Sequence, residues 1–158
     1  MRSWIGFVLT VTVLVLDAWP AWACTCPEEH SVAWSFGDCD AVFIGEVVSV
    51  RDTALGAGGC SGSYSAKVVR LRVTRAWSGV RAGTVTTVVT GSGSGDCGYP
   101  FEGKRHLIYA TRFDPRAWTT NICMRTRPMP FGAPDSIALS QLRRRDARRL
   151  GPDQTHSP

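Results

Sequence analysis

The sequence has no Cys-x-x-Cys pair and few histidines, the residues that most often build redox and metal sites. None of the three histidines is spaced like a metal ligand, so thioredoxin-like redox chemistry and zinc ribbons are not expected. The sequence also lacks a nucleophile–base pair or paired carboxylates with supporting spacing. We therefore expect neither an enzyme nor a resident cofactor. The histidines are His30, His106 and His156.

The chain has one apolar run and no second stretch long enough to cross a membrane. The run covers residues 4–16, which is short for a bilayer span of ~20 residues. The small-x-small triplet at residues 21–23 is typical of a signal-cleavage site. We predict that residues 1–23 are a cleaved secretory signal and that the mature, secreted or extracytoplasmic chain begins at Cys24. An uncleaved anchor and a lipoprotein acylated at Cys24 stay open as alternatives.

The cysteines indicate the compartment of the mature chain. All six follow the predicted cleavage point, and an even number in a small exported protein indicates a disulfide framework. Sequence alone does not choose among the possible pairings. The six are Cys24, Cys26, Cys39, Cys60, Cys97 and Cys123.

Five segments have the composition of β-strands separated by turn signals. The second alternates, with apolar residues at positions 69, 71 and 73 and polar ones between them, as in a half-buried strand. Gly45 interrupts the first segment, which indicates a bulge or a bend. Five such strands suggest a small sandwich or barrel. The segments are residues 41–50, 65–77, 84–90, 106–113 and 118–123, with a helical turn near 31–36 and a loop at 52–63.

The net charge is +5, and arginines are densest near the end of the chain. We treat residues 135–158 as a basic helical or flexible tail. Asp135 or Ser136 could cap a helix that runs to about residue 149 with Ile137, Leu139 and Leu142 on its apolar side. The arginines could contact an anionic surface or nucleic acid. We expect a solvated helix face instead, because no aromatic residues lie between them.

The predicted mature amino terminus resembles that of a known family. It reads Cys24-Thr25-Cys26-Pro27 and is followed by a strand that contains Ala41-Val42-Phe43 and by the triplet Cys97-Gly98-Tyr99. These features resemble the tissue inhibitors of metalloproteinases, whose chains begin Cys-Thr-Cys at the signal-cleavage point. The resemblance is to their amino-terminal domain. It implies an all-β fold over residues 24–134, a five-stranded OB-fold barrel of the netrin-like type with short flanking helices.

The resemblance also implies a set of disulfides. By the family's pattern Cys24 pairs with Cys97 and Cys26 pairs with Cys123, which leaves Cys39 to pair with Cys60. This last pair departs from the family, whose third bond reaches a cysteine beyond the fifth strand. The family's carboxy-terminal domain has no counterpart here, so its part in partner recognition is not carried over.

By resemblance, the protein inhibits a zinc metalloprotease in trans. The α-amine and carbonyl oxygen of a first residue can close a five-membered ring on a metal. Catalytic zinc keeps an open position for the attacking water, which such a chelate displaces. Cys24 would bind the zinc of the protease. We expect the protein to be a monomer with no nucleic-acid partner and no membrane span. The contact residues implied are Cys24, Thr25, Cys26, Pro27, Gly95, Asp96 and Gly98.

A different class of function stays open. The chain can be a non-inhibitory OB-fold binding module for a peptide, a glycan or a surface partner, because a fold does not settle a function. In that case an extra residue before Cys24 leaves binding intact, whereas it abolishes inhibition by chelation. An enzyme would require an activity that survives mutation of Cys24 and depends on His106.

Overall fold

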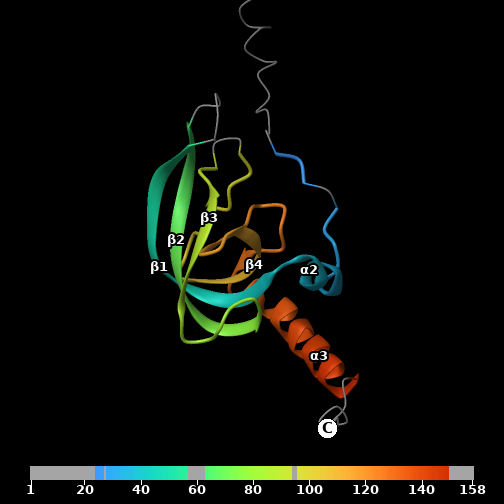
Figure 1. Cartoon of the computed structure of the whole chain (residues 1–158). Helices are drawn as coiled ribbons and strands as arrows, with labels where there is room; N and C mark the ends of the chain where they lie inside the picture. The colour runs from blue at the N-terminus through green and yellow to red at the C-terminus, as the bar shows by residue number, and fades with distance from the viewer. Residues whose placement is uncertain (1–23, 27, 57–62, 94–95, 150–158) are drawn as a thin grey trace, which may run out of the picture.

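The computed structural model describes residues 24–26, 28–56, 63–93 and 96–149. The predicted signal, and also Pro27, Cys60 and Gly95, lie outside these residues. Within them the chain is mostly β, with helices α2 (Val32–Asp38) and α3 (Ala133–Arg149) beside the strands (Figure 1). No helix in this part of the chain is long and apolar enough to cross a bilayer.

The strands form one sheet that closes on itself. Its order is β1-β2-β3-β5-β4-β6, and a further pairing between β1 and β4 joins the first five into a ring. β3 and β5 run parallel, and the other pairs are antiparallel. The expectation of a mostly β chain with flanking helices is confirmed. The strands are β1 (Ala41–Gly56), β2 (Ser63–Ser78), β3 (Val85–Gly91), β4 (Arg105–Asp114), β5 (Ala117–Thr119) and β6 (Arg127–Pro128).

The first strand takes part in two pairings because it bends. Its register against β2 shifts at three places, one of them between Ile44 and Gly45. A Cβ on Gly45 would lie 3.1 Å from the Cβ of Leu71 and 3.2 Å from the ring of Phe43, so the bend packs tightly. The predicted irregularity at Gly45 is confirmed, and it lets residues 41–46 of β1 also pair with β4.

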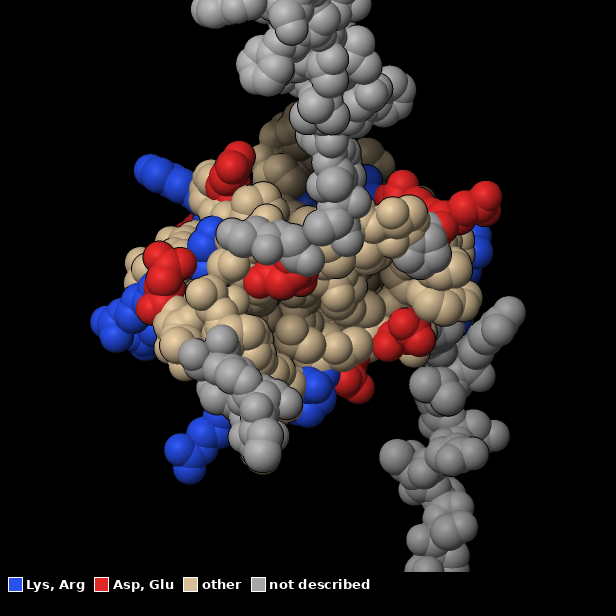
Figure 2. Space-filling model, turned by 90° about the horizontal axis from the view of Figure 1, so that it is seen from above, with Lys and Arg blue, Asp and Glu red and all other residues tan. Residues whose placement is uncertain are grey.

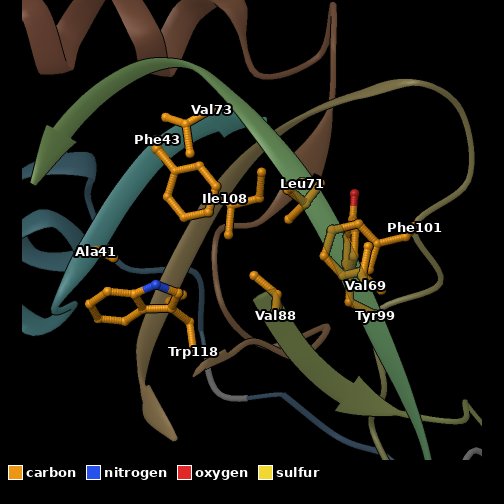
Figure 3. Packing of buried hydrophobic residues seen from close by; sticks show 11 residues of the cluster. Ala41, Phe43, Val69, Leu71, Val73, Val88, Tyr99, Phe101, Ile108 and Trp118 are labelled. Carbon is orange, nitrogen blue, oxygen red and sulfur yellow. The ribbon is translucent and has the colours of Figure 1, made fainter. Parts of the chain in front are cut away.

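Apolar side chains from all sides of the ring fill its interior (Figure 3). The predicted alternation of β2 is confirmed: Val69, Leu71 and Val73 are buried, and the polar residues between them are exposed. Phe43 from β1 and Ile108 from β4 lie opposite them. A core closed by hydrogen-bonded strands on every side gives the loops at its ends a rigid base.

A second apolar cluster lies outside the ring, under the helices. Residues of β4 alternate between the two clusters, so that Tyr109 faces the helices while its neighbour Ile108 faces the ring's interior. Leu139 of α3 is fully buried here. The expectation that Ile137 shares the apolar side is wrong, because Ile137 is 61% exposed. Helix α3 also begins earlier than predicted, at Ala133.

Two strand boundaries differ from the predictions. Residues 52–56 continue β1 and do not form a loop, because backbone pairing with β2 runs on to Gly56 and Ser63. The fifth strand ends at Thr119, well before Cys123. Its early end has a local cause: the side-chain oxygen of Asn121 accepts the amide N–H groups of Cys123 and Met124, which turns the chain.

Candidate functional site: an amino terminus held by two disulfides

Two disulfides attach the start of the described chain to the ring. Cys24 is bonded to Cys97 and Cys26 to Cys123, with Cα–Cα distances of 5.6 and 5.0 Å. These are the two pairs that the resemblance implies. Thr25 lies between the two attachment points and is exposed. We call residues 24–26, together with Asp96 and Cys97, the N-terminal ridge.

The loop that receives the first disulfide is organised by the carboxylate of Asp96. Its oxygens accept the amide N–H groups of Ser92, Gly93 and Gly98 at 2.6, 2.8 and 3.1 Å. Partial desolvation alone would raise the pKa of Asp96, but these hydrogen bonds outweigh it and lower the pKa below its usual value. The ionised carboxylate therefore links the amides of residues 92, 93 and 98 beside Cys97.

Close packing also shapes this loop. A Cβ added to Gly98 would lie 2.1 Å from the carbonyl oxygen of Gly91, so only glycine fits where the two segments touch. Cys97 has a φ of 57°, a conformation that non-glycine residues rarely adopt. Of the predicted contact residues, Thr25 and Asp96 are exposed, whereas Gly98 is buried and contributes to the loop's shape.

The two loops that hold the disulfides are bonded to each other. The amide of Ile122 donates to the carbonyl of Cys97 at 2.9 Å, and Gly98 forms a β-bridge with Asn121. The same Asn121 side chain fixes the turn that leads to Cys123. The two disulfides therefore attach residues 24–26 to a single rigid support.

The expectation that Cys39 pairs with Cys60 is wrong. Cys39 has a free thiol at the end of α2, and burial, helped by the charges of Asp38 and Asp40, raises its pKa to about 11. Cys60 lies outside the described residues. The physical reason lies in the surroundings of Cys39, which packs against the apolar cluster under the helices that contains Trp77 and Leu139.

A groove of about 600 Å³ lies beside the second disulfide. Three of its lining side chains are large and apolar yet exposed: Trp34 by 50%, Ile122 by 43% and Phe131 by 72%. The ring of His30 stacks on that of Trp34, with centroids 3.7 Å apart. Contiguous exposed apolar side chains mark interaction sites. Sequence reasoning missed this groove because its walls come from three separate segments.

An ion-pair cluster ties the segment after the ridge to α3. Both oxygens of Asp135 accept from Arg125, at 2.9 and 3.0 Å, and the Arg125 guanidinium also donates to the carbonyl of His30. Glu29 contacts Arg125 at 3.1 Å and also pairs with Arg127. The hydrogen bonds from Arg125 to Asp135 raise the pKa of the guanidinium and keep it charged. The sequence offers no signal for contacts between residues so far apart in the chain.

His106 is fully buried, and its side chain contacts neighbouring core residues. Its Nδ1 atom lies 3.0 Å from the hydroxyl of Tyr99, and its ring packs edge-on against Phe101. Burial lowers the pKa of His106, and a backbone hydrogen bond at Gly103 offsets only part of this. Among the residues that the structure describes, no group of three or more His, Cys, Asp or Glu side chains could hold a metal ion.

The face that carries the N-terminal ridge has no dominant charge. Figure 2 shows acidic and basic side chains scattered over the face seen from above, with acidic atoms also near its centre. The chain matches no protein-family model and has no significant match among curated proteins. The geometry of the ridge and of the groove therefore carries the functional argument.

Proposed function

We propose that the protein is a secreted inhibitor of zinc metalloproteases and that it chelates the catalytic zinc through the α-amine and carbonyl oxygen of Cys24. The observation that carries the proposal is the double attachment of residues 24–26 by disulfides on either side of Thr25. The protein itself is then a ligand for the metal of its partner, with no catalytic activity of its own.

The rigid support explains why such a segment can bind tightly. Chain termini are normally mobile, and a mobile segment loses conformational entropy when it binds. Here the ordering takes place on folding, because both disulfides end in loops that are hydrogen-bonded to each other. Thr25, exposed between the two bonds, would then enter the protease's pocket beside the zinc.

We also assign the ring of strands to the OB-fold. The strand order, the closure between β1 and β4 and the parallel pairing of β3 with β5 support this assignment. Disulfides form in oxidising compartments. The two bonds therefore support a location outside the cytoplasm, where a signal sequence at residues 1–23 would deliver the chain.

The decisive experiment compares the mature protein that begins at Cys24 with a variant that carries one alanine before Cys24. Inhibition is measured against a panel of zinc metalloproteases with fluorogenic peptides, after mass spectrometry has verified both amino termini. We expect the mature form to inhibit and the extended form to lose at least about tenfold in affinity, ~1.4 kcal/mol. The control carries the same alanine after Pro158. Equal inhibition by the mature and extended forms would rule out chelation.

A pH series adds a second readout. A zinc ligand must be a neutral amine, and an α-amine has a usual pKa of ~7.7–8.0. Affinity should therefore weaken as the pH falls from about 8 to 6, once the protease's own pH dependence has been removed with a small zinc-binding inhibitor. An inhibitor that uses only the side chain of Thr25 would show no such dependence.

The groove beside the second disulfide supports a second candidate, a binding module for an extended peptide with apolar side chains. Trp34, Ile122 and Phe131 would receive those side chains. In this case Trp34→Ala abolishes peptide binding, and the added alanine before Cys24 leaves it unchanged. The two variants therefore separate the two functions.

A further inference from the structure

A second hollow, of about 280 Å³, lies between β2 and α3. Arginines dominate its lining, and none of the lining residues that the structure describes is acidic. We call it the arginine cleft. Its lining residues are Arg75, Ala76, Trp77, Ser140, Arg143 and Arg144.

Arg75 is held in place by neutral partners. Its guanidinium donates to the hydroxyl oxygen of Ser140 at 3.0 Å and lies over the ring of Trp77, 4.9 Å from the centroid. The Ser140 hydroxyl in turn donates its own proton to the carbonyl of Ser136, so its lone pairs are left to accept from Arg75. These contacts fix the position of Arg75 and leave its charge uncompensated.

The helix supplies the other two arginines. Arg143 donates to the carbonyl of Ala76 at 3.1 Å, which again orients a guanidinium without neutralising it. Arg144 makes no hydrogen bond or ion pair with any side chain that the structure describes. The ion pairs among the described residues involve none of the three arginines in the cleft.

Three guanidinium groups that have no acidic partner among the described side chains meet in one hollow, and this favours an anionic ligand. Arginine presents donors in a planar fork that matches the oxygens of a phosphoryl group, and such bonds are short and strong because both partners are charged. Further arginines at positions 145, 148 and 149 continue along α3, with Asp146 as the one acid among them. A ligand with several phosphoryl groups in a row therefore fits better than a single small anion.

We infer that the arginine cleft binds a phosphoryl group and that the basic end of α3 binds further phosphoryl groups of the same carrier. This site is separate from the N-terminal ridge and does not depend on the inhibitor proposal. It assigns an anionic partner to arginines for which the sequence pattern favours a solvated helix face.

The test uses inorganic polyphosphate as a soluble probe and vesicles of phosphatidylglycerol in phosphatidylcholine as a lipid probe. Affinity for each is measured by titration with the folded, disulfide-bonded protein. We expect Arg75→Gln to weaken binding about tenfold or more, the loss expected when a charge-assisted pair worth ~1.4 kcal/mol disappears. Arg144→Gln should weaken it several-fold.

Arg144→Gln is the sharper variant because Arg144 does not hold α3 against β2. Its thermal unfolding midpoint should equal that of the parent protein, so any loss of affinity belongs to the cleft. The matched control is Arg72→Gln, which removes the same charge from an exposed position on β2 outside the cleft.

Each outcome of this comparison either supports or overturns the proposed binding of a phosphoryl group in the arginine cleft. A loss with Arg144→Gln and not with Arg72→Gln supports the cleft, and the probe that responds identifies a soluble or a lipid-borne phosphoryl group. Equal losses with both variants would reduce the effect to net charge and overturn the proposal. Absence of binding to both probes would overturn it as well.

Discussion

The two disulfides should stabilise the fold by nearly equal amounts, although they close loops of different size. Their sequence separations are 73 and 97 residues. Taken alone, closing loops of this size lowers the entropy of the unfolded chain, which stabilises the folded state by ~4.4 and ~4.7 kcal/mol at about 25 °C. The loops share most of their length, however, so the contributions do not simply add.

The effect of removing one bond follows from the bond that is kept. With either disulfide in place, the other closes a circuit of only about 28 residues, from Cys24 to Cys26 and from Cys97 to Cys123. A loop of that size contributes ~3.5 kcal/mol. Removal of both bonds should cost ~8 kcal/mol, which is comparable to the whole stability of a typical domain at ~5–15 kcal/mol.

The assay is guanidinium unfolding of two paired variants under oxidising conditions, one with Cys24→Ser and Cys97→Ser, the other with Cys26→Ser and Cys123→Ser. With a slope of ~4 kcal/mol per molar guanidinium, each midpoint should fall by about 0.9 M. The reasoning would be refuted if one pair cost less than ~1 kcal/mol while the other cost ~4 kcal/mol or more. Such a result would mean that one bond constrains a chain already ordered without it.

Three further changes probe other parts of the structure. Asp135→Ala should cost ~1.5–3 kcal/mol in thermal or denaturant unfolding, because the largely buried guanidinium of Arg125 loses both hydrogen bonds to that carboxylate and keeps only the exposed Glu29 as an acidic partner; a loss below ~1 kcal/mol would contradict this. Gly98→Ala should destabilise the protein and alter the amide NMR signals of its loop, whereas Gly37→Ala, which meets nothing within 4 Å, should not. Because burial lowers the pKa of His106, the unfolded chain binds a proton first, and the stability that neutral His106 contributes is complete above about pH 6.5 and falls below it. His106→Gln should flatten this part of a urea-unfolding pH series, and an unchanged slope would show that the histidine titrates alike in both states.

Much of the fold was predictable from the sequence because it rests on local periodicity. The alternation of β2 places Val69, Leu71 and Val73 inside, and the β-branched run of β3 and the glycine of β1 each act within a few residues. The boundaries that failed depend on non-local contacts or on single side chains. Residues 52–56 become strand because a partner strand lies beside them, and Asn121 ends the fifth strand by turning the chain.

The candidate site also combines features that follow from the local sequence with features that depend on contacts between distant segments. The sequence determined which residues form the predicted amino terminus, and it indicated that disulfides cross-link the chain. Both follow from residue types and their order. Only the tertiary structure decided that Cys39 has no bonded partner, that the two disulfide loops support each other, and that Arg75 meets Arg143 and Arg144 across a cleft. Contacts between distant segments depend on how the ring closes and how α3 packs against it. That geometry cannot be predicted from any local pattern of residues.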